Sequence, residues 1–373
     1  MDYSIRLAQP HDLPALITFM RQAYGPNTIF QSEEYLRWYL GRGPHGETGF
    51  HLESQIAVTP AGAVVGHYGG LSGKLLLNGR LVSLVWGINA YTLPEYRRFG
   101  IGKQVIEATM ARHDVYGIIG VTRKVAEFYV EIGFNLFDYQ RFIRYVRPLT
   151  DDTYAICRLI GQDEAALRTL LAAAATTPET VPAGVQVLTA DSLRSLTWDL
   201  EAPTGTTAAY RDAAYMQWRF FAQPAMRYTV LGVVQGGRVV AYAVVRPETM
   251  QPTDHRVDRV IDLYGQPAAI VPLLRAIVAL AQANASAYVD FSGFGVLYRA
   301  ALLEAGFAEL NETDLELLPQ VSAPAVARPN MEHVCFYSTR YADEIAALRF
   351  ENVYFTRGDA DRDRLVHLHQ LTA

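Results

Sequence analysis

Hydrophobic positions along residues 51–147 are spaced so as to predict three strands, a helix, a strand, a helix and a final strand. The predicted strands span 51–65, 66–82, 83–91, 115–121 and 134–146, and the predicted helices span 102–113 and 125–132. Asn78-Gly79 predicts a hairpin turn within the second strand, and Gly133 is a natural C-terminal cap of the second helix. Two further helices are expected upstream, over 12–24 and 32–40.

The same order of elements recurs in the second half of the chain. Strands are predicted over 228–234, 238–245, 257–263 and 287–291, with helices around 270–278 and 298–302. Gly133-Phe134 and Gly306-Phe307 end equivalent helices, so the chain carries an internal duplication. Residues 176–209, rich in Thr, Pro and Ala, are expected to connect the copies. We predict an N-terminal domain over 1–150, a connecting segment over 151–209, and a C-terminal domain with an extension over 210–373.

Composition limits the classes of protein that this chain can belong to. Its 373 residues are ample for two domains, half of them are hydrophobic, and 19% are charged. The net charge of −5 argues against a general nucleic-acid partner, and no apolar run approaches the ~18–20 residues of a membrane span. The N-terminus lacks a signal-peptide pattern, and Cys157 and Cys335 lack metal-binding spacing. These features predict a cytoplasmic protein with free thiols, no membrane or nucleic-acid partner and no metal.

The most informative stretch is Arg97-Arg98-Phe99-Gly100-Ile101-Gly102. It follows the strand that ends near Tyr91 and opens an amphipathic helix. Glycines allow close approach of the backbone, and the free N–H groups at a helix start attract anions. The arginines add charge-assisted hydrogen bonds. The stretch therefore predicts a site for a phosphate or pyrophosphate.

This turn is followed about thirty residues later by Ala126-x-x-Tyr129-x-x-x-Gly133-Phe134. Together the two motifs resemble those of the GNAT family of acyl-CoA-dependent N-acyltransferases, over most of residues 1–147 and more weakly over about 210–310. The resemblance implies an α/β fold of two GNAT-like domains in tandem, each a mixed, mostly antiparallel sheet flanked by helices, the second degenerate. It implies that the coenzyme A pyrophosphate binds around Arg97, Arg98, Phe99, Gly100, Ile101, Gly102 and Lys103. The strand end Ala90-Tyr91-Thr92 would pair through its backbone with the pantetheine arm.

The second copy lacks the phosphate-binding turn. Gly265-Gln266-Pro267-Ala268-Ala269 stands there without a basic residue, and Leu302 occupies the position equivalent to Tyr129. We therefore expect one acyl-CoA site per chain.

Acyl transfer to an amine requires a base for the ammonium and an acid for the departing thiolate. Tyr129 matches the tyrosine that GNAT enzymes commonly use as that acid. The base is not evident, because the strand over 83–93 contains no Asp, Glu or His, and Asn89 is the polar residue there that could hold a water. Glu53, His51 and His67 on neighbouring strands, a second-copy side chain, or an ordered chain of water are the alternatives.

Three other segments carry candidate chemistry. His367 and His369 have alternate spacing but no third ligand, so they predict a solvent-facing pair rather than a metal site. Residues 215–220 mix aromatics with an arginine and could stack a nucleobase, or equally cap the second core. The charged run 354–364 is typical of a solvated loop, yet it resembles the ending of tandem GNAT proteins associated with acylated amino sugars of bacterial surface glycans.

The leading prediction is an N-acyltransferase that moves an acetyl or short acyl group from acyl-CoA to a small amine, first of all a nucleotide-linked amino sugar. Aminoglycoside acetyltransferases and mycothiol-type synthases are competing groups within the family. Transferases that use aminoacyl-tRNA are disfavoured by the acidic balance. A non-catalytic acyl-CoA sensor is the alternative from another class. The sequence does not determine the acyl chain length, the amine, the base or the oligomeric state, for which a homodimer is one option.

Overall fold

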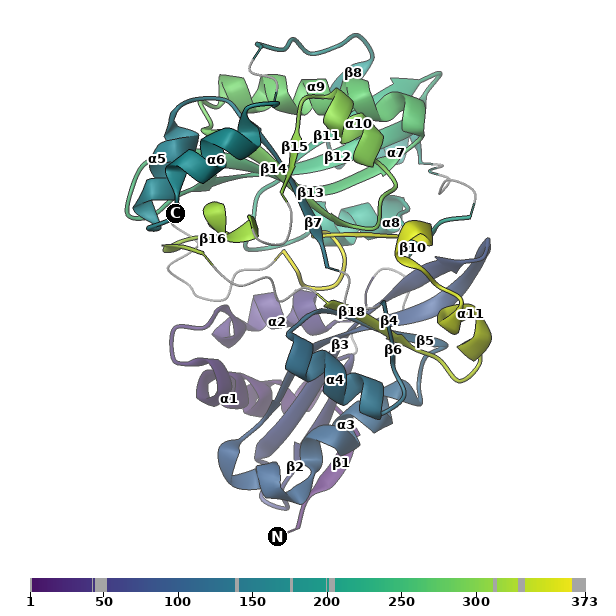
Figure 1. Cartoon of the computed structure of the whole chain (residues 1–373). Helices are drawn as coiled ribbons and strands as arrows, with labels where there is room; N and C mark the ends of the chain where they lie inside the picture. The colour runs from purple at the N-terminus through teal and green to yellow at the C-terminus, as the bar shows by residue number, and fades with distance from the viewer. Residues whose placement is uncertain are drawn as a thin grey trace.

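A computed structural model describes most of the chain (Figure 1). The described residues are 2–41, 43, 52–137, 141–174, 177–198, 200, 205–310, 314–327 and 333–363. The candidates His51, His367 and His369, and the last residue of the charged run, Arg364, lie outside them.

The first half forms a mixed sheet in which strands run antiparallel except for one parallel pair. Its elements are β1 (Ser4–Leu7), α1 (Leu13–Tyr24), α2 (Glu33–Leu40), β2 (Ser54–Val58), β3 (Val64–Leu77), β4 (Arg80–Thr92), α3 (Ile101–Met110), β5 (Val115–Val121), α4 (Arg123–Glu131) and β6 (Asn135–Leu136). The strand order is β1-β2-β3-β4-β5-β18-β6, where β18 (His333–Tyr337) comes from the C-terminal part of the chain. Only β4 and β5 are parallel in this series.

The predicted hairpin turn at Asn78-Gly79 is confirmed, with positive φ angles of 50° and 76°. The predicted strand boundary at Gly66 is wrong, because β3 runs through this residue. A Cβ at Gly66 would lie 2.5 Å from the Ile101 side chain of α3, so glycine here permits close helix packing rather than a break. Gly69, which faces the other way, approaches Leu40 of α2, so α2 and α3 cover opposite faces of the sheet.

The second half repeats the first element by element. It contains β8 (Val185–Leu188), α7 (Ser192–Ser195), β9 (Thr197–Trp198), α8 (Ala213–Met216), β11 (Thr229–Gln235), β12 (Arg238–Thr249), β13 (Arg256–Gly265), α9 (Pro267–Ala283), β14 (Tyr288–Phe294), α10 (Arg299–Glu304) and β15 (Ala308–Leu310). The strand order β8-β11-β12-β13-β14-β7-β15 matches the first sheet, again with one parallel pair, β13 and β14, in this series. The predicted duplication is therefore present in the structure.

The two sheets exchange a strand. β7 (Ile143–Pro148) follows the first half in sequence but lies between β14 and β15 of the second sheet. β18 of the second half occupies the equivalent place between β5 and β6. The strand predicted over 134–146 is accordingly divided into β6 and β7, which lie in different sheets. Each sheet therefore contains one strand from the other half of the chain.

The segment predicted to connect the copies is largely ordered. Besides β8 and β9 it contains α5 (Asp152–Leu159), α6 (Glu164–Leu171) and β10 (Thr207–Ala209). β8 pairs with β11 of the second sheet, whereas β10 pairs with β3 of the first. The division of the chain at residues 150 and 209 stays a prediction.

The C-terminal segment, residues 353–363, lies between the two halves (yellow in Figure 1). Its strand β19 (Val353–Thr356) pairs with the end of β14, and the amide of Gly358 donates to the carbonyl of Ile261 in β13 over 2.8 Å. β13 and β14 pair directly only over 258–260 and 289–291. The C-terminal segment thus fills the gap that opens between them.

Buried charges hold this segment in place. The guanidinium of Arg211 lies 2.9 Å from Asp262 of β13 and 2.7 Å from Asp359 of the segment, and all three side chains are fully buried. The hydroxyl of Tyr215 donates to the carbonyl of Gly358 over 2.9 Å. The expectation that residues 354–364 form a solvated loop is wrong for the described residues, because most of them are buried, and Arg211 and Arg246 of the second half neutralise Asp359 and Asp363.

Two further expectations concern membranes and thiols. Within the described ranges, no helix combines the length and the apolar character needed to cross a bilayer. Cys157 and Cys335 are both buried and unbridged. Burial raises the pKa of the Cys157 thiol to about 11 and that of Cys335 to about 12, so both stay protonated at neutral pH.

Candidate active site

A gap opens between β4 and β5 in the first sheet. The two strands pair from Leu84 opposite Val115 to Trp86 opposite Gly117, and then diverge. Beyond Trp86, none of the described strands pairs with the gap-side edge of β4, which continues to Thr92. Such an edge offers backbone N–H and C=O groups to an extended ligand. In contrast to the second sheet, no strand among the described residues fills this gap.

A β-bulge bends β4 beside the gap. His67 of β3 stands opposite Tyr91, and Gly69 stands opposite Ile88, so two residues of β4, Asn89 and Ala90, face a single residue of β3. Asn89 has a φ of 50°, an uncommon value for a residue other than glycine. Bulges of this kind redirect a strand at a functional edge.

His67 holds the bulge from the opposite strand. Its ring is fully buried, with Nδ1 3.0 Å from the carbonyl oxygen of Asn89 and Nε2 3.1 Å from the hydroxyl of Ser54. The Asn89 carbonyl can only accept, so Nδ1 donates to it, and burial disfavours a second proton, which leaves Nε2 to accept from the Ser54 hydroxyl. Burial lowers the pKa of His67 to about 4. Both nitrogens are engaged, so His67 is poorly placed to act as the base that the sequence left open.

The basic turn lies at the wide end of the gap. Pro94–Phe99 form a 3-10 turn, and Gly100, with a φ of 69°, leads into α3. Arg97 and Arg98 are exposed; Arg97 donates to the carbonyl of Thr92 over 3.1 Å and lies 5.4 Å from the ring of Tyr91. The Lys103 ammonium lies 3.7 Å from Glu107 one turn along α3. The structure thus brings the predicted cofactor-binding residues together around one helix start.

Tyr129 lies on α4, which begins after the N-cap Thr122 and ends before Gly133. Its side chain is 4% exposed, and its hydroxyl lies 3.0 Å from the hydroxyl of Tyr68 on β3. A Cβ at Gly87 of β4 would collide with the Tyr68 hydroxyl, so Tyr68 crosses β4 close to where the gap begins. Burial raises the pKa of Tyr129, which keeps the phenol protonated.

Glu53 is buried beside β3. Its carboxylate accepts a hydrogen bond from the hydroxyl of Ser72 over 3.2 Å, and it lies 3.3 Å from His113 and 3.5 Å from Arg112. Glu53 is the carboxylate among the base candidates from the sequence. Its hydrogen bond with Ser72 places it next to the pocket that Ser72 lines.

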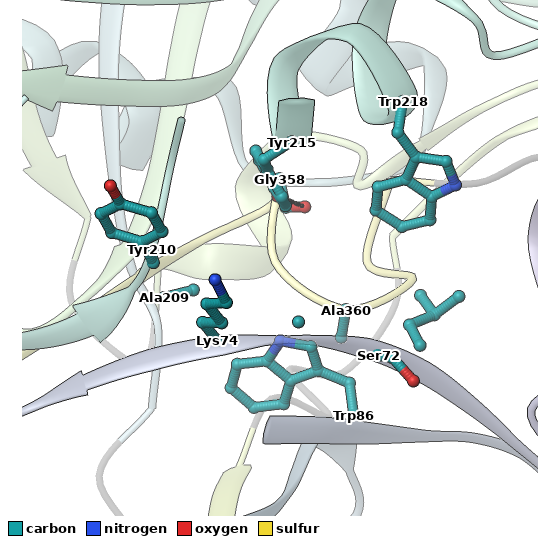
Figure 2. Close-up of a pocket in the computed structure, with 11 residues that line it drawn as sticks. Ser72, Lys74, Trp86, Ala209, Tyr210, Tyr215, Trp218, Gly358 and Ala360 are labelled. Carbon is teal, nitrogen blue, oxygen red and sulfur yellow. Dashed lines mark hydrogen bonds between the residues drawn. The ribbon is translucent and has the colours of Figure 1, made fainter. Parts of the chain in front are cut away.

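A pocket that is partly open to solvent lies between the halves (Figure 2). β3 and β4 form one wall, and the 207–218 region and the C-terminal segment form the other. Its lining residues are Leu71, Ser72, Gly73, Lys74, Trp86, Ala209, Tyr210, Tyr215, Trp218, Gly358 and Ala360. In Figure 2 the Lys74 side chain points from β3 toward the segment that carries Tyr215 and Trp218. Four aromatic rings and one ammonium group therefore line the same space.

The segment 215–220 divides its side chains between this pocket and the protein interior. Trp218 lines the pocket and stacks on Trp38 of α2, with ring centroids 5.7 Å apart. Arg219 is instead buried and donates to the carbonyls of Gly358 and Asp363, both over 3.1 Å. Tyr215 and Trp218 thus line the pocket, whereas Phe220 lies in the core and Arg219 contacts the C-terminal segment.

Sequence reasoning missed Lys74, Trp86 and Tyr210 as pocket residues. The available signal was Lys74 itself, a single charge in the predicted strand segment Gly70-Leu71-Ser72-Gly73-Lys74-Leu75-Leu76-Leu77. Lys74 is half-buried, and its ammonium has no hydrogen-bond or ion-pair partner in the part of the chain that the structure describes. No cluster of His, Cys, Asp and Glu among those residues could hold a metal ion.

Solved structures resemble this chain in fold. A GCN5-related N-acetyltransferase from Anabaena variabilis matches with a TM-score of 0.54 and 12% identity over 90% of this chain and 73% of its own. Saccharomyces cerevisiae N-myristoyltransferase with bound myristoyl-CoA matches with a TM-score of 0.53 and 10% identity over 90% and 79%. A probable N-acyltransferase from Enterococcus faecalis matches with a TM-score of 0.52 and 9% identity over 86% and 76%. The chain therefore has the GNAT fold, as predicted.

Sequence comparisons add nothing to this assignment. No protein-family model matches the chain. No curated protein matches it at a significant level either.

Proposed function

We propose that this protein is an acyl-CoA-dependent N-acyltransferase. The observation that carries the proposal is the gap between β4 and β5, which has Arg97 and Arg98 at its wide end and the Tyr129 phenol near its apex. A pyrophosphate at the helix start and an extended pantetheine arm along β4 would direct the thioester toward that apex. The GNAT fold of the chain supports the same function.

In this reaction the amine attacks the thioester carbonyl, and the thiolate leaves with a proton from Tyr129. Purified protein, acetyl-CoA and a panel of amines should release free thiol. Tyr129→Phe should lower kcat by about 10²-fold or more, because general acid catalysis contributes on that scale. Tyr288→Phe, a change in a fully buried tyrosine of β14, is the matched control and should leave kcat unchanged.

Binding of CoA without turnover across the panel would instead identify an acyl-CoA sensor. The two functions differ in their need for Tyr129, because a sensor binds CoA through the turn and transfers no proton to sulfur. Thiol release that is insensitive to Tyr129→Phe would leave the transferase proposal standing but remove the acid from it.

For the acceptor, we propose the amine of a nucleotide-linked amino sugar. The pocket beside Trp86 supports this class, since aromatic rings stack on a nucleobase and the Lys74 ammonium attracts a phosphate. An aminoglycoside, the alternative, is a polycation, and a lysine in the pocket opposes it by like-charge repulsion.

Two substitutions test the acceptor. Lys74→Met and Trp218→Leu should each raise the KM for a nucleotide-linked amino sugar about tenfold, the effect of one charge-assisted or stacking contact. The Kd for CoA should not change. Lys124→Met, on the exposed side of α4, is the control. A KM that rises for aminoglycosides but not for nucleotide sugars would overturn the proposed acceptor.

A further inference from the structure

Three phenol groups converge below Gly87, at the apex of the gap. The hydroxyls of Tyr68 and Tyr129 lie 3.0 Å apart. A Cβ at Gly87 would collide with the hydroxyl of Tyr68 and also with that of Tyr116 on β5, so all three hydroxyls lie within a few ångströms of this glycine. The rings of Tyr68 and Tyr116 are 5.9 Å apart. The three residues come from three different elements, β3, β5 and α4.

The Tyr116 hydroxyl is an unusual member of this cluster. The side chain is fully buried, yet its hydroxyl has no hydrogen-bond partner among the residues that the structure describes. A buried hydroxyl without a partner costs stability, and Tyr145 and Tyr288 share this feature. What distinguishes Tyr116 is that its hydroxyl lies with that of Tyr68 against Gly87, at the apex of the gap. Any side chain at position 87 would displace both hydroxyls from the apex.

We propose that Tyr68 and Tyr116 are positioning residues that make Tyr129 an effective acid toward the leaving thiolate. The inference rests on the proposed function and deepens its site. In the step concerned, the carbon–sulfur bond of the tetrahedral intermediate breaks and the sulfur takes the Tyr129 proton. Tyr68 then donates to the phenolate oxygen, and Tyr116 does so once its ring shifts to bring its hydroxyl within hydrogen-bond distance. The proton lost by the amine is returned to Tyr129 through solvent, so the products are an amide and free CoA.

The neighbouring hydroxyls are needed because Tyr129 is buried. Burial disfavours a phenolate and raises the pKa of Tyr129, so an isolated phenol at this place would give up its proton reluctantly. Hydrogen bonds donated to the charged form act in the opposite direction. A protonated phenol beside two other phenols can therefore release its proton in the transition state without a permanent charge in the core.

The test compares two acyl donors in the full-length protein. Acetyl-CoA has a basic leaving thiol, whereas S-phenyl thioacetate releases the far more acidic thiophenol, which needs no proton at departure. Tyr68→Phe and Tyr116→Phe should each lower kcat/KM with acetyl-CoA about 10- to 100-fold, a part of the ~10²- to 10⁴-fold that acid catalysis supplies. With S-phenyl thioacetate the loss should be no more than about twofold. The Kd for CoA should be unchanged in both variants.

Tyr288→Phe removes another buried hydroxyl and serves as the control, with no effect on either donor. Gly87→Ala provides an independent variant that leaves all three phenols in the chain but separates them, and it should show the same dependence on the donor. Equal losses with both donors, or unchanged kinetics in Tyr68→Phe and Tyr116→Phe, would overturn the inference. In those cases thiol release by the wild type would still support the proposed function, so the two failures are distinguishable.

Discussion

The Nδ1 atom of His67 lies 3.0 Å from the carbonyl oxygen of Asn89, the residue at which β4 bulges toward the gap. This contact joins two strands where regular pairing is interrupted. Because Nδ1 donates to this carbonyl and burial disfavours a charged ring, the bulge is held by a neutral imidazole. The geometry of the proposed pantetheine edge is therefore linked to the charge of one buried histidine.

His67→Gln should make the protein less sensitive to acid. Burial lowers the pKa of His67 from 6.5 to about 4. Between pH 6.5 and pH 4, this residue is therefore protonated in the unfolded chain but not in the native state. Stability from the neutral ring is fully present above pH 6.5 and is lost as the pH falls toward 4, by up to about 3 kcal/mol. Denaturant unfolding across this pH range should show that the free energy of unfolding of the wild type falls toward that of the variant as the pH decreases.

The exposed His11, changed to Gln, is the control for that experiment, and its variant should follow the wild type at every pH. A constant difference in stability between wild type and His67→Gln from pH 7 to pH 4 would contradict the assignment of a neutral buried ring.

Replacing Arg97 and Arg98 by Ala should weaken CoA binding. Each exposed guanidinium can form a charge-assisted hydrogen bond of about 1.5–3 kcal/mol with a phosphate, so the double variant should raise the Kd at least about 100-fold. Calorimetric titration of CoA measures this change. Arg194→Ala, an exposed arginine paired with Asp191, is the control. Unchanged affinity in the double variant would remove the phosphate site from this turn.

The stoichiometry of CoA binding should be one per chain. In the second half, residues 353–363 fill the gap between β13 and β14, and the Gly358 amide donates a hydrogen bond to β13. At the equivalent place in the first half, no described strand pairs with the edge of β4. The start of α9 also lacks a basic residue, since it begins at Pro267 after Gln266. Saturation at two equivalents would show that the second gap opens.

The contrast between the halves explains which features the sequence could predict. The elements from β11 to α10 lie close to their predicted ranges because their hydrophobic periodicity is local. The basic turn and Tyr129 were found because they sit at fixed distances from glycines that end or begin a helix. Such features need no knowledge of the partner element.

The exchange of β7 and β18 left no comparable signal. Each is a short strand that pairs with residues far along the chain, and periodicity alone does not say to which sheet a strand belongs. The charged run 354–363 was misjudged for the same reason, because its neutralising partners, such as Arg211, are distant in sequence. Lys74 and Tyr210 likewise line the same pocket because β10 pairs with β3, a long-range pairing that the sequence pattern does not indicate.

Arg211→Met should destabilise the protein and weaken acceptor binding while sparing CoA binding. Removing one member of a buried charge cluster leaves Asp262 and Asp359 without their cation, which typically costs about 3–5 kcal/mol. Asp359 belongs to the segment that lines the pocket through Gly358 and Ala360, so its release should also raise the acceptor KM. The CoA turn lies in the other half and should keep its Kd. Denaturant unfolding, acceptor kinetics and CoA titration measure the three effects, with Arg194→Met as the exposed control. A loss of stability below about 1 kcal/mol, as for a surface ion pair, would contradict the role assigned to this cluster.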